Sequence, residues 1–272
     1  MTAWMSRDQK AYEEDAAMGF YREREIAESL AQACRVLAGF NMTDGAHGHV
    51  SYRMEDDTML IKGKGPGQVG LRHTAARDIV KVNWDADMVD GPDDLQPPSE
   101  SFLHIWIYKA RPDVMSVVHV HPKHAVLLTI TGKPIVSAYG PYRPGADLAR
   151  DGVPIYPDAR TIGTPEQGEA FAETMGNHNV ALMTGHGIAS AGDCIERSTM
   201  NALALEILCE TMVDAYRIGT PQPLPASTWG NRTEQPTETG RRRRGSAGGT
   251  EGMLASWRDY VAEAEDRLGS RI

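Results

Sequence analysis

The sequence predicts a single α/β domain with a central sheet, followed by a C-terminal helical extension. Short runs of β-branched and apolar residues alternate with segments of helical periodicity, and the apolar share of 41% is that of an ordinary globular chain. Beyond Gly219 the composition changes to Pro, Thr, Ser, Gly and Arg. We therefore divide the 272 residues into an N-terminal arm (1–21), a metal-binding domain (22–219) and an extension with a polar linker and a helix (220–272).

The first half of the domain is expected to contain one helix and three strands. Apolar residues in segment 22–39 recur at spacings of three and four, which defines one face of a helix that Gly39 ends. Residues 49–53 and 58–62 are strand-like runs separated by three acidic residues, which predicts a hairpin. Residues 79–82 predict a further strand.

In the second half, helices and strands alternate more clearly. The expected order is helix 101–109, strand 114–121, helix 123–130, strand 179–184, helix 194–217 and, in the extension, helix 252–268. The long helix 194–217 carries apolar and small residues, so we expect it to lie in the core.

Charge and hydropathy exclude several classes of protein. The net charge of -9, from 28 basic and 37 acidic residues, should repel nucleic acids and anionic membranes. The chain has no run of 18 apolar residues to cross a membrane and no apolar segment typical of a secretory signal. Three widely spaced cysteines favour the reducing cytoplasm. The four arginines at 241–244 predict a solvated loop, with a contact to nucleic acid or anionic lipid as the alternative.

Three histidines and one glutamate suggest a metal site. His119 and His121 alternate with valines in a strand, so both side chains project from the same face. His186 follows an apolar strand between two glycines, and Glu100 begins a helix. Each residue also has an ordinary explanation: surface histidines, a turn histidine, and a carboxylate beside a helix dipole. Together, three imidazoles and a carboxylate are a ligand set for Zn²⁺, Fe²⁺, Mn²⁺ or Co²⁺.

With these residues in place, segment 22–217 resembles the class II aldolase/adducin family. The resemblance rests on four motifs in order, Gly48-His49-Val50-Ser51-Tyr52-Arg53, Ser99-Glu100, His119-Val120-His121-Pro122 and Gly185-His186-Gly187. It implies an α/β/α fold with a central, mostly antiparallel sheet, and a homotetramer with sites between subunits. It also implies that the three histidines hold a divalent metal, with Glu100 as fourth ligand or as acid/base.

The sequence departs from the sugar-phosphate members of that family at three positions. His49 stands where those members usually carry an asparagine that helps to hold phosphate, Lys64-Gly65 stands at a Thr-Gly or Ser-Gly turn, and Pro98 replaces a serine. These changes argue against a phosphorylated substrate. Lys64, on a glycine-rich loop, would instead attract a carboxylate as a point charge.

The departures resemble a branch of decarboxylases that act on dihydroxyphthalate. In such chemistry the metal stabilises developing negative charge, and either Glu100 or His124 protonates the ring carbon that loses CO₂. The residues expected to contact the aromatic acid are His49, Ser51, Lys64 and Ser99. The alternatives are an aldolase on an unphosphorylated hydroxy-ketone or keto acid, and a non-haem iron oxygenase of an aromatic acid. A non-catalytic scaffold is disfavoured, because scaffold members lack the metal histidines.

Overall fold

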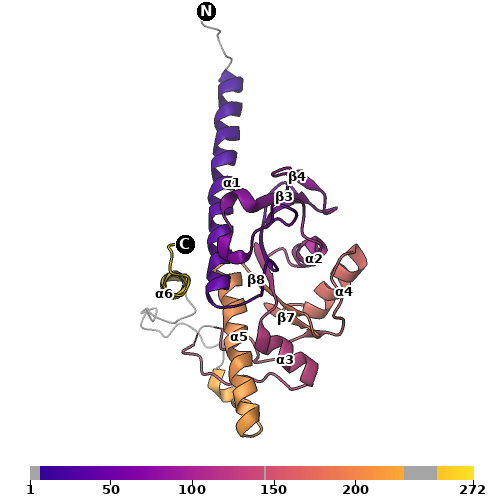
Figure 1. Cartoon of the computed structure of the whole chain (residues 1–272), viewed down its shortest axis with the longest axis vertical. Coiled ribbons are helices and arrows are strands. Elements are labelled where there is room, and N and C mark those ends of the chain that lie inside the picture. Colours follow the sequence, from indigo (N-terminus) through magenta and orange to yellow (C-terminus); the bar gives the residue numbers. More distant parts are fainter. Residues whose placement is uncertain (1–6, 144, 230–249) are drawn as a thin grey trace, which may run out of the picture.

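The structure is a computed structural model that describes residues 7–143, 145–229 and 250–272. The four arginines at 241–244 lie outside the described residues. A single eight-stranded sheet forms the centre of the molecule, and helices cover both of its faces (Figure 1). The expected α/β/α architecture is confirmed.

The sheet is mixed but mostly antiparallel, as the family resemblance implied. Its strands are β1 (His49–Arg53), β2 (Thr58–Lys62), β3 (Ile79–Asn83), β4 (Met88–Asp90), β5 (Ser116–Val120), β6 (Ile155–Tyr156), β7 (Val180–Met183) and β8 (Gly187–Gly192). Their order across the sheet is β4-β3-β2-β1-β5-β8-β7-β6, and only the pair β6–β7 is parallel. The predicted hairpin is the antiparallel pair β1–β2.

The helices divide between the two faces of the sheet. They are α1 (Arg7–Gly39), α2 (Ser101–Ala110), α3 (Lys123–Thr131), α4 (Pro165–Met175), α5 (Ile195–Ile218) and α6 (Thr250–Leu268), with short 3₁₀ turns at Leu71–His73, Ala76–Asp78 and Ala226–Trp229. Residues of α1, α3, α5 and α6 form one hydrophobic core with Val118 and Val120 of β5. Residues of α2 and α4 form a second core with Val117 of the same strand. Because side chains alternate along a strand, odd-numbered residues of β5 face α2.

Several elements differ from those expected. Helix α1 begins at Arg7, well before residue 22, so the proposed arm is largely helical. Strands β4 and β6 were missed because they are short and partly exposed. Strand β8 was missed because Gly, Ala and Ser, which have weak strand propensity, make up most of it. Helix α4 was also missed, although the sequence contains a signal for its start. Thr164 caps the helix, and Gln167 completes a capping box.

The long helix α5 lies in the core over most of its length, as expected. The extension is polar on average, yet its helix adds to the core. Helix α6 buries four apolar side chains at helical spacing, Met253, Trp257, Ala264 and Leu268, and packs against α1 of the same chain. Among the described helices, none combines the length and hydropathy that a membrane span requires.

Candidate metal centre

Four potential ligands converge at one end of the sheet. His119 is the next-to-last residue of β5, and His121 directly follows that strand. His186 lies in the turn between β7 and β8, and Glu100 precedes the first residue of α2. One ligand atom from each residue lies within 4.8 Å of every other. We call these four residues the ligand cluster.

Local backbone geometry places His186 in this group. Gly185 has a φ of 66°, a left-handed conformation that glycine adopts without strain. Gly187 packs so closely against β5 that an added Cβ would lie 2.4 Å from the Val120 carbonyl oxygen. The two glycines therefore allow the turn to approach the end of β5 and bring the His186 ring to His119 and His121.

The distances suit a single ion. Nε2 of His119 lies 3.0 Å from His121 Nε2 and 3.0 Å from Glu100 Oε2, and His186 Nε2 lies 3.6 Å from Glu100 Oε1. Ligand bonds of about 2.0–2.2 Å around one ion place neighbouring ligand atoms about 3.0–3.5 Å apart. The chemistry and the spacing of this donor set therefore fit a divalent metal.

Outer contacts orient two of the ligands. His119 Nδ1 lies 2.9 Å from the Ile188 carbonyl oxygen, so this nitrogen carries the proton and the lone pair of Nε2 faces the cluster. The Ile162 amide donates to Glu100 Oε1 at 3.1 Å. Both contacts leave a ligand atom directed at the centre.

The electrostatics favour the metal-binding protonation state at His121 and Glu100. Burial, together with His119 and His186, lowers the pKa of His121 to about 3, so its imidazole is neutral at pH 7. Burial raises the pKa of Glu100, but the contacts with His119 and His186 outweigh it and hold that pKa far below its usual range. Neutral imidazoles beside a carboxylate are the forms that ligate divalent cations. Burial lowers the pKa of His186, but the contact with Glu100 outweighs it and raises that pKa.

A second polar group lies beside the cluster, buried between β1 and α2. His49 Nδ1 lies 2.7 Å from His104 Nε2, His104 Nδ1 lies 2.7 Å from Ser51 Oγ, and Ser51 Oγ lies 2.6 Å from the Tyr108 hydroxyl. We call these four residues the histidine–hydroxyl chain. His104 and Tyr108 were not predicted, although Glu100, His104 and Tyr108 recur at a spacing of four, which places them on one face of α2.

The histidine–hydroxyl chain shows that the expected role of Ser51, contact with the substrate, is wrong. The Ser51 side chain is fully buried and its hydroxyl contacts His104 and Tyr108, so Ser51 has no surface to offer a substrate. His49 is 8% exposed, and its Nε2 lies 4.0 Å from Glu100 Oε2, so it borders the ligand cluster.

Lys64 and Ser99 lie together, as their expected shared role requires. The Lys64 ammonium donates to the Ser99 hydroxyl, and the backbone of Lys64 forms a bridge with Gln96. Ser99 directly precedes Glu100, so the positive charge of Lys64 lies at the N-terminal end of α2, near the ligand cluster. The pair is available to an anionic group.

His124 is bonded to helix α5. Its Nδ1 lies 2.8 Å from Oε1 of Glu206 on α5, and the other oxygen of Glu206 accepts from the Ala125 amide. A cavity of 410 Å³ opens onto the cluster, and its walls are Asp44, His47, His121, Ala159, Thr161, Gly185 and His186. His124 is not among these residues, so the structure does not support it as the proton donor.

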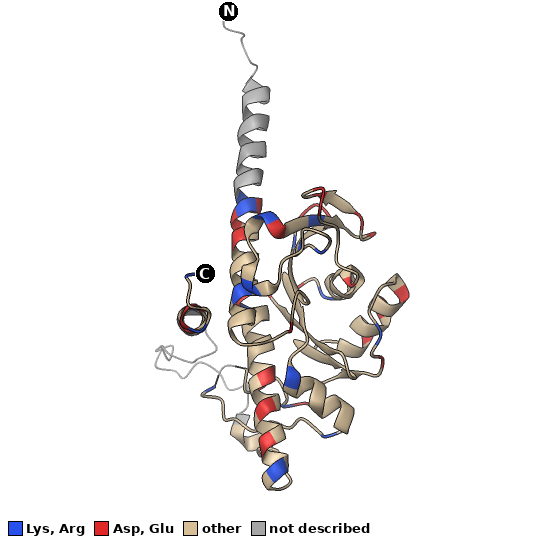
Figure 2. Cartoon of the chain, viewed as in Figure 1, with Lys and Arg blue, Asp and Glu red and all other residues tan. Residues whose placement is uncertain are grey.

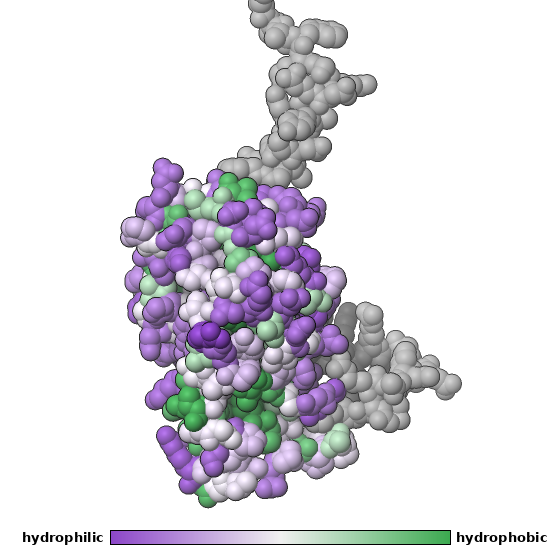
Figure 3. Space-filling view, turned by 90° about the vertical axis from the view of Figure 1, so that its right-hand side faces the viewer, coloured by the Kyte–Doolittle hydropathy of each residue, from purple (hydrophilic) through white to green (hydrophobic). Residues whose placement is uncertain are grey.

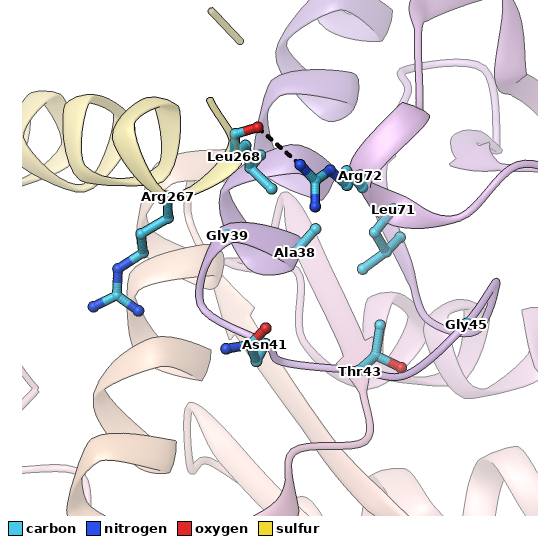
Figure 4. Close-up of a pocket in the computed structure, with 9 residues that line it drawn as sticks. All are labelled: Ala38, Gly39, Asn41, Thr43, Gly45, Leu71, Arg72, Arg267 and Leu268. Carbon is cyan, nitrogen blue, oxygen red and sulfur yellow. Dashed lines mark hydrogen bonds between the residues drawn. The ribbon is translucent and has the colours of Figure 1, made fainter. Parts of the chain in front are cut away.

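A second cavity, of 420 Å³, lies between the C-terminal end of α1 and α6 (Figure 4). Its Arg72 guanidinium donates to the Leu268 carbonyl oxygen at 2.8 Å, and the close-up shows Arg267 directed away from Arg72. Arg267 is paired with Glu263 and stacks over the Phe40 ring. The lining offers no imidazole or carboxylate for acid–base chemistry, in contrast to the cavity over the ligand cluster.

Comparison with known proteins agrees with these features. The family model "Class II Aldolase and Adducin N-terminal domain" matches residues 28–213. The chain is 34% identical over 215 residues to a 3,4-dihydroxyphthalate decarboxylase of Terrabacter sp. (strain DBF63), covering 76% of this chain and 87% of that relative. It is 35% identical over 195 residues to a 3,4-dihydroxyphthalate decarboxylase of Rhodococcus jostii (strain RHA1), covering 70% and 80%.

Solved structures share the fold at lower identity. An aldolase II superfamily protein from Pseudomonas syringae superposes with a TM-score of 0.72 at 23% identity, covering 90% of this chain and 93% of that chain. An L-fuculose 1-phosphate aldolase from Glaciozyma antarctica PI12 gives a TM-score of 0.70 at 18% identity, covering 92% and 93%.

Proposed function

The chain belongs to the class II aldolase and adducin family and is a carbon–carbon lyase, and on this premise we propose a metal-dependent, non-oxidative decarboxylase of a hydroxylated aromatic carboxylate. The proposed substrate resembles dihydroxyphthalate, on which the relatives at 34–35% identity are named as acting. The observation that carries the proposal is the convergence of three imidazoles and one carboxylate beside a lysine–serine pair.

The ligand cluster would hold one divalent ion, Zn²⁺, Fe²⁺, Mn²⁺ or Co²⁺. When bound, such an ion supplies Lewis-acid stabilisation of the negative charge that develops as a carbon–carbon bond breaks. The lysine–serine pair would bind a carboxylate of the substrate, since an ammonium and a hydroxyl both donate to it.

Glu100 would move the proton. Glu100 lies within the ligand cluster, so its carboxylate would accept the phenolic proton of a substrate bound there. It would return this proton to the ring carbon that carries the carboxylate. The electron pair of the carbon–carboxylate bond then enters the ring as CO₂ leaves, and the product phenolate takes a proton from water.

An aldolase acting on an unphosphorylated hydroxy-ketone or keto acid is the second candidate, because solved aldolases share the fold. Oxidative cleavage of an aromatic acid is the third, because Fe²⁺ suits the same ligand set. Release of CO₂ without oxygen consumption distinguishes decarboxylation from both.

The test is a substrate panel on the metal-loaded protein, with hydroxylated benzoates, hydroxylated phthalates, sugar phosphates and unphosphorylated hydroxy-ketones. We expect CO₂ from at least one hydroxylated phthalate, no oxygen uptake, and no cleavage of sugar phosphates. Aldehyde formation from a hydroxy-ketone without CO₂ from any aromatic acid would replace the decarboxylase with the aldolase.

We also propose that the active unit is a homotetramer. Apolar surface gathers in the lower half of the face in Figure 3, and Ile130 of α3 is 59% exposed. Ile130 packs beside Gly185, next to the ligand His186, so a second subunit covering this surface would close the site. Figure 2 shows acidic residues along the lower half of α5. Sedimentation at micromolar concentration should give a tetramer, and a monomer would contradict the proposal.

A further inference from the structure

The histidine–hydroxyl chain has a direction that its hydrogen atoms determine. His49 Nδ1 and His104 Nε2 lie 2.7 Å apart, so one of these two nitrogens carries the proton of their contact and the other accepts it. Burial lowers the pKa of His104 to about 3, so this ring is neutral and carries one N–H. His104 contacts His49 through one nitrogen and Ser51 through the other. Whichever nitrogen of His104 holds the proton therefore sets the order of the whole chain.

Two orders are possible. In the first, Tyr108 donates to Ser51, Ser51 donates to His104 Nδ1, and His104 Nε2–H donates to His49 Nδ1, which leaves the remaining proton of His49 on Nε2. In the second, His49 donates from Nδ1 to His104, and its Nε2 presents a lone pair.

The end of the chain beside the ligand cluster favours the first order. There, His49 Nε2 faces Glu100 Oε2 at 4.0 Å, and a lone pair directed at a carboxylate is repelled, whereas an N–H is attracted. At the other end, burial raises the pKa of Tyr108, and the contacts with Ser51 and with the Val117 backbone act against it. The phenol and the Ser51 hydroxyl can each donate in their contact, so this end is compatible with either order.

We propose that His104, Ser51 and Tyr108 are positioning residues that hold His49 in the tautomer with its proton on Nε2, directed toward the substrate beside the ligand cluster. There the N–H would donate to an oxygen of the aromatic acid, a contact that rests on the proposed function. His49 lies directly opposite His119 in the β1–β5 register, so the donor is placed next to a metal ligand by the sheet itself. The other three residues act only through His49, because they lie behind it: Ser51, His104 and Tyr108 are fully buried.

The direct test is the tautomer of His49, read from the ¹⁵N shifts of its ring in the wild-type protein loaded with diamagnetic Zn²⁺. Loss of one set of signals in His49→Gln assigns the ring. We expect the proton on Nε2 in the wild type, and a proton on Nδ1 would overturn the proposal. This measurement needs no substrate, so failure of the decarboxylase assay leaves its outcome intact.

Kinetics of matched variants provide the second test. Ser51→Ala removes the donor to His104, whereas Ser116→Ala removes another fully buried serine hydroxyl, one bonded to Ser198 and to the Ser51 carbonyl oxygen. Because partners behind a site typically change activity about 10- to 100-fold, we expect that loss in kcat/KM for Ser51→Ala and a smaller loss for Ser116→Ala, with equal metal content. Equal losses in the two variants would mean a merely structural role and would contradict the proposal.

Substitution of His104 separates donation from packing. His104→Gln keeps an N–H near the position of Nε2, whereas His104→Leu removes it. We expect His104→Gln to recover most of the activity that His104→Leu loses, and the His49 signals to move away from the Nε2–H tautomer only in His104→Leu. A His49 tautomer unchanged in His104→Leu would overturn the role of His104.

Discussion

Two groups of histidines lie side by side in this molecule and have opposite surroundings. In the ligand cluster, the Nε2 atoms of His119 and His121 approach to 3.0 Å and meet the carboxylate of Glu100. In the histidine–hydroxyl chain, His49 and His104 bond to each other and then to two hydroxyls. The comparison teaches that the partners of an imidazole, and not its burial, separate a potential metal ligand from a hydrogen-bonding residue.

Removing a ligand should have the largest effect. We expect His119→Ala to lose the metal and to reduce activity by more than the roughly 100-fold that loss of an outer partner can cost. Metal analysis and CO₂ release measure the two losses, and far-UV circular dichroism checks the fold. The exposed His73 provides the control, since His73→Ala should retain both metal and activity. A His119→Ala protein with full metal content would contradict the assignment of His119 as a metal ligand.

Removing the lysine beside the cluster should weaken substrate binding and leave the metal in place. A charged hydrogen bond contributes about 1.5–3 kcal/mol, so Lys64→Ala should raise KM about 10- to 100-fold. Lys64→Arg should recover part of this loss, because the charge is retained. Lys133→Ala, at a lysine that stacks over Tyr216, serves as the control. An unchanged KM in Lys64→Ala would exclude the lysine–serine pair from the substrate site.

Acid should destabilise the metal-free protein through the buried histidines. The folded-state pKa of His104 is about 3, below the usual 6.5, so between these values the unfolded chain takes up a proton that the folded chain does not. Stability therefore falls as the pH falls from about 6.5 toward 3, by up to about 1.4 kcal/mol per pH unit for this group. Urea unfolding at pH 7 and pH 5 should show a smaller difference for His104→Gln than for the wild type. Equal differences would mean that His104 is not held neutral.

The smallest effect is expected at His124. Because its ring bonds to Glu206, His124→Gln should change kcat less than about 10-fold, which is below the contribution of a typical general acid. Steady-state CO₂ release at saturating substrate measures kcat. A loss of about 100-fold or more in kcat would indicate that His124 is the proton donor. Its ring would then have to leave Glu206 during the reaction.

The sequence predicted the centre better than its surroundings. Alternation along β5 placed His119 and His121 on one face, and the glycines around His186 indicated a close turn. The histidine–hydroxyl chain could not be predicted in the same way, because the meeting of His104 with Ser51 depends on how α2 docks on β1. Strand β8 also escaped prediction, because its small residues are stabilised by pairing with both neighbours and not by their own propensity.

Helix α6 lies where the sequence predicts a helix, but the polar composition of the extension does not predict how it packs. Its apolar face packs on α1, and the ring of Phe40, just after α1, meets the Tyr260 ring edge-on with centroids 5.4 Å apart. Average composition was misleading there, because helical spacing and not the mean decides which residues are buried.

Chelation and reconstitution test the central claim most directly. The wild-type protein is assayed for CO₂ release from 3,4-dihydroxyphthalate as purified, after exhaustive chelation, and after return of Zn²⁺, Fe²⁺, Mn²⁺ or Co²⁺ one at a time. We expect chelation to abolish CO₂ release and one of the ions to restore it, while His119→Ala stays inactive throughout. Full activity in the chelated protein would contradict a metal-dependent decarboxylase centred on the ligand cluster.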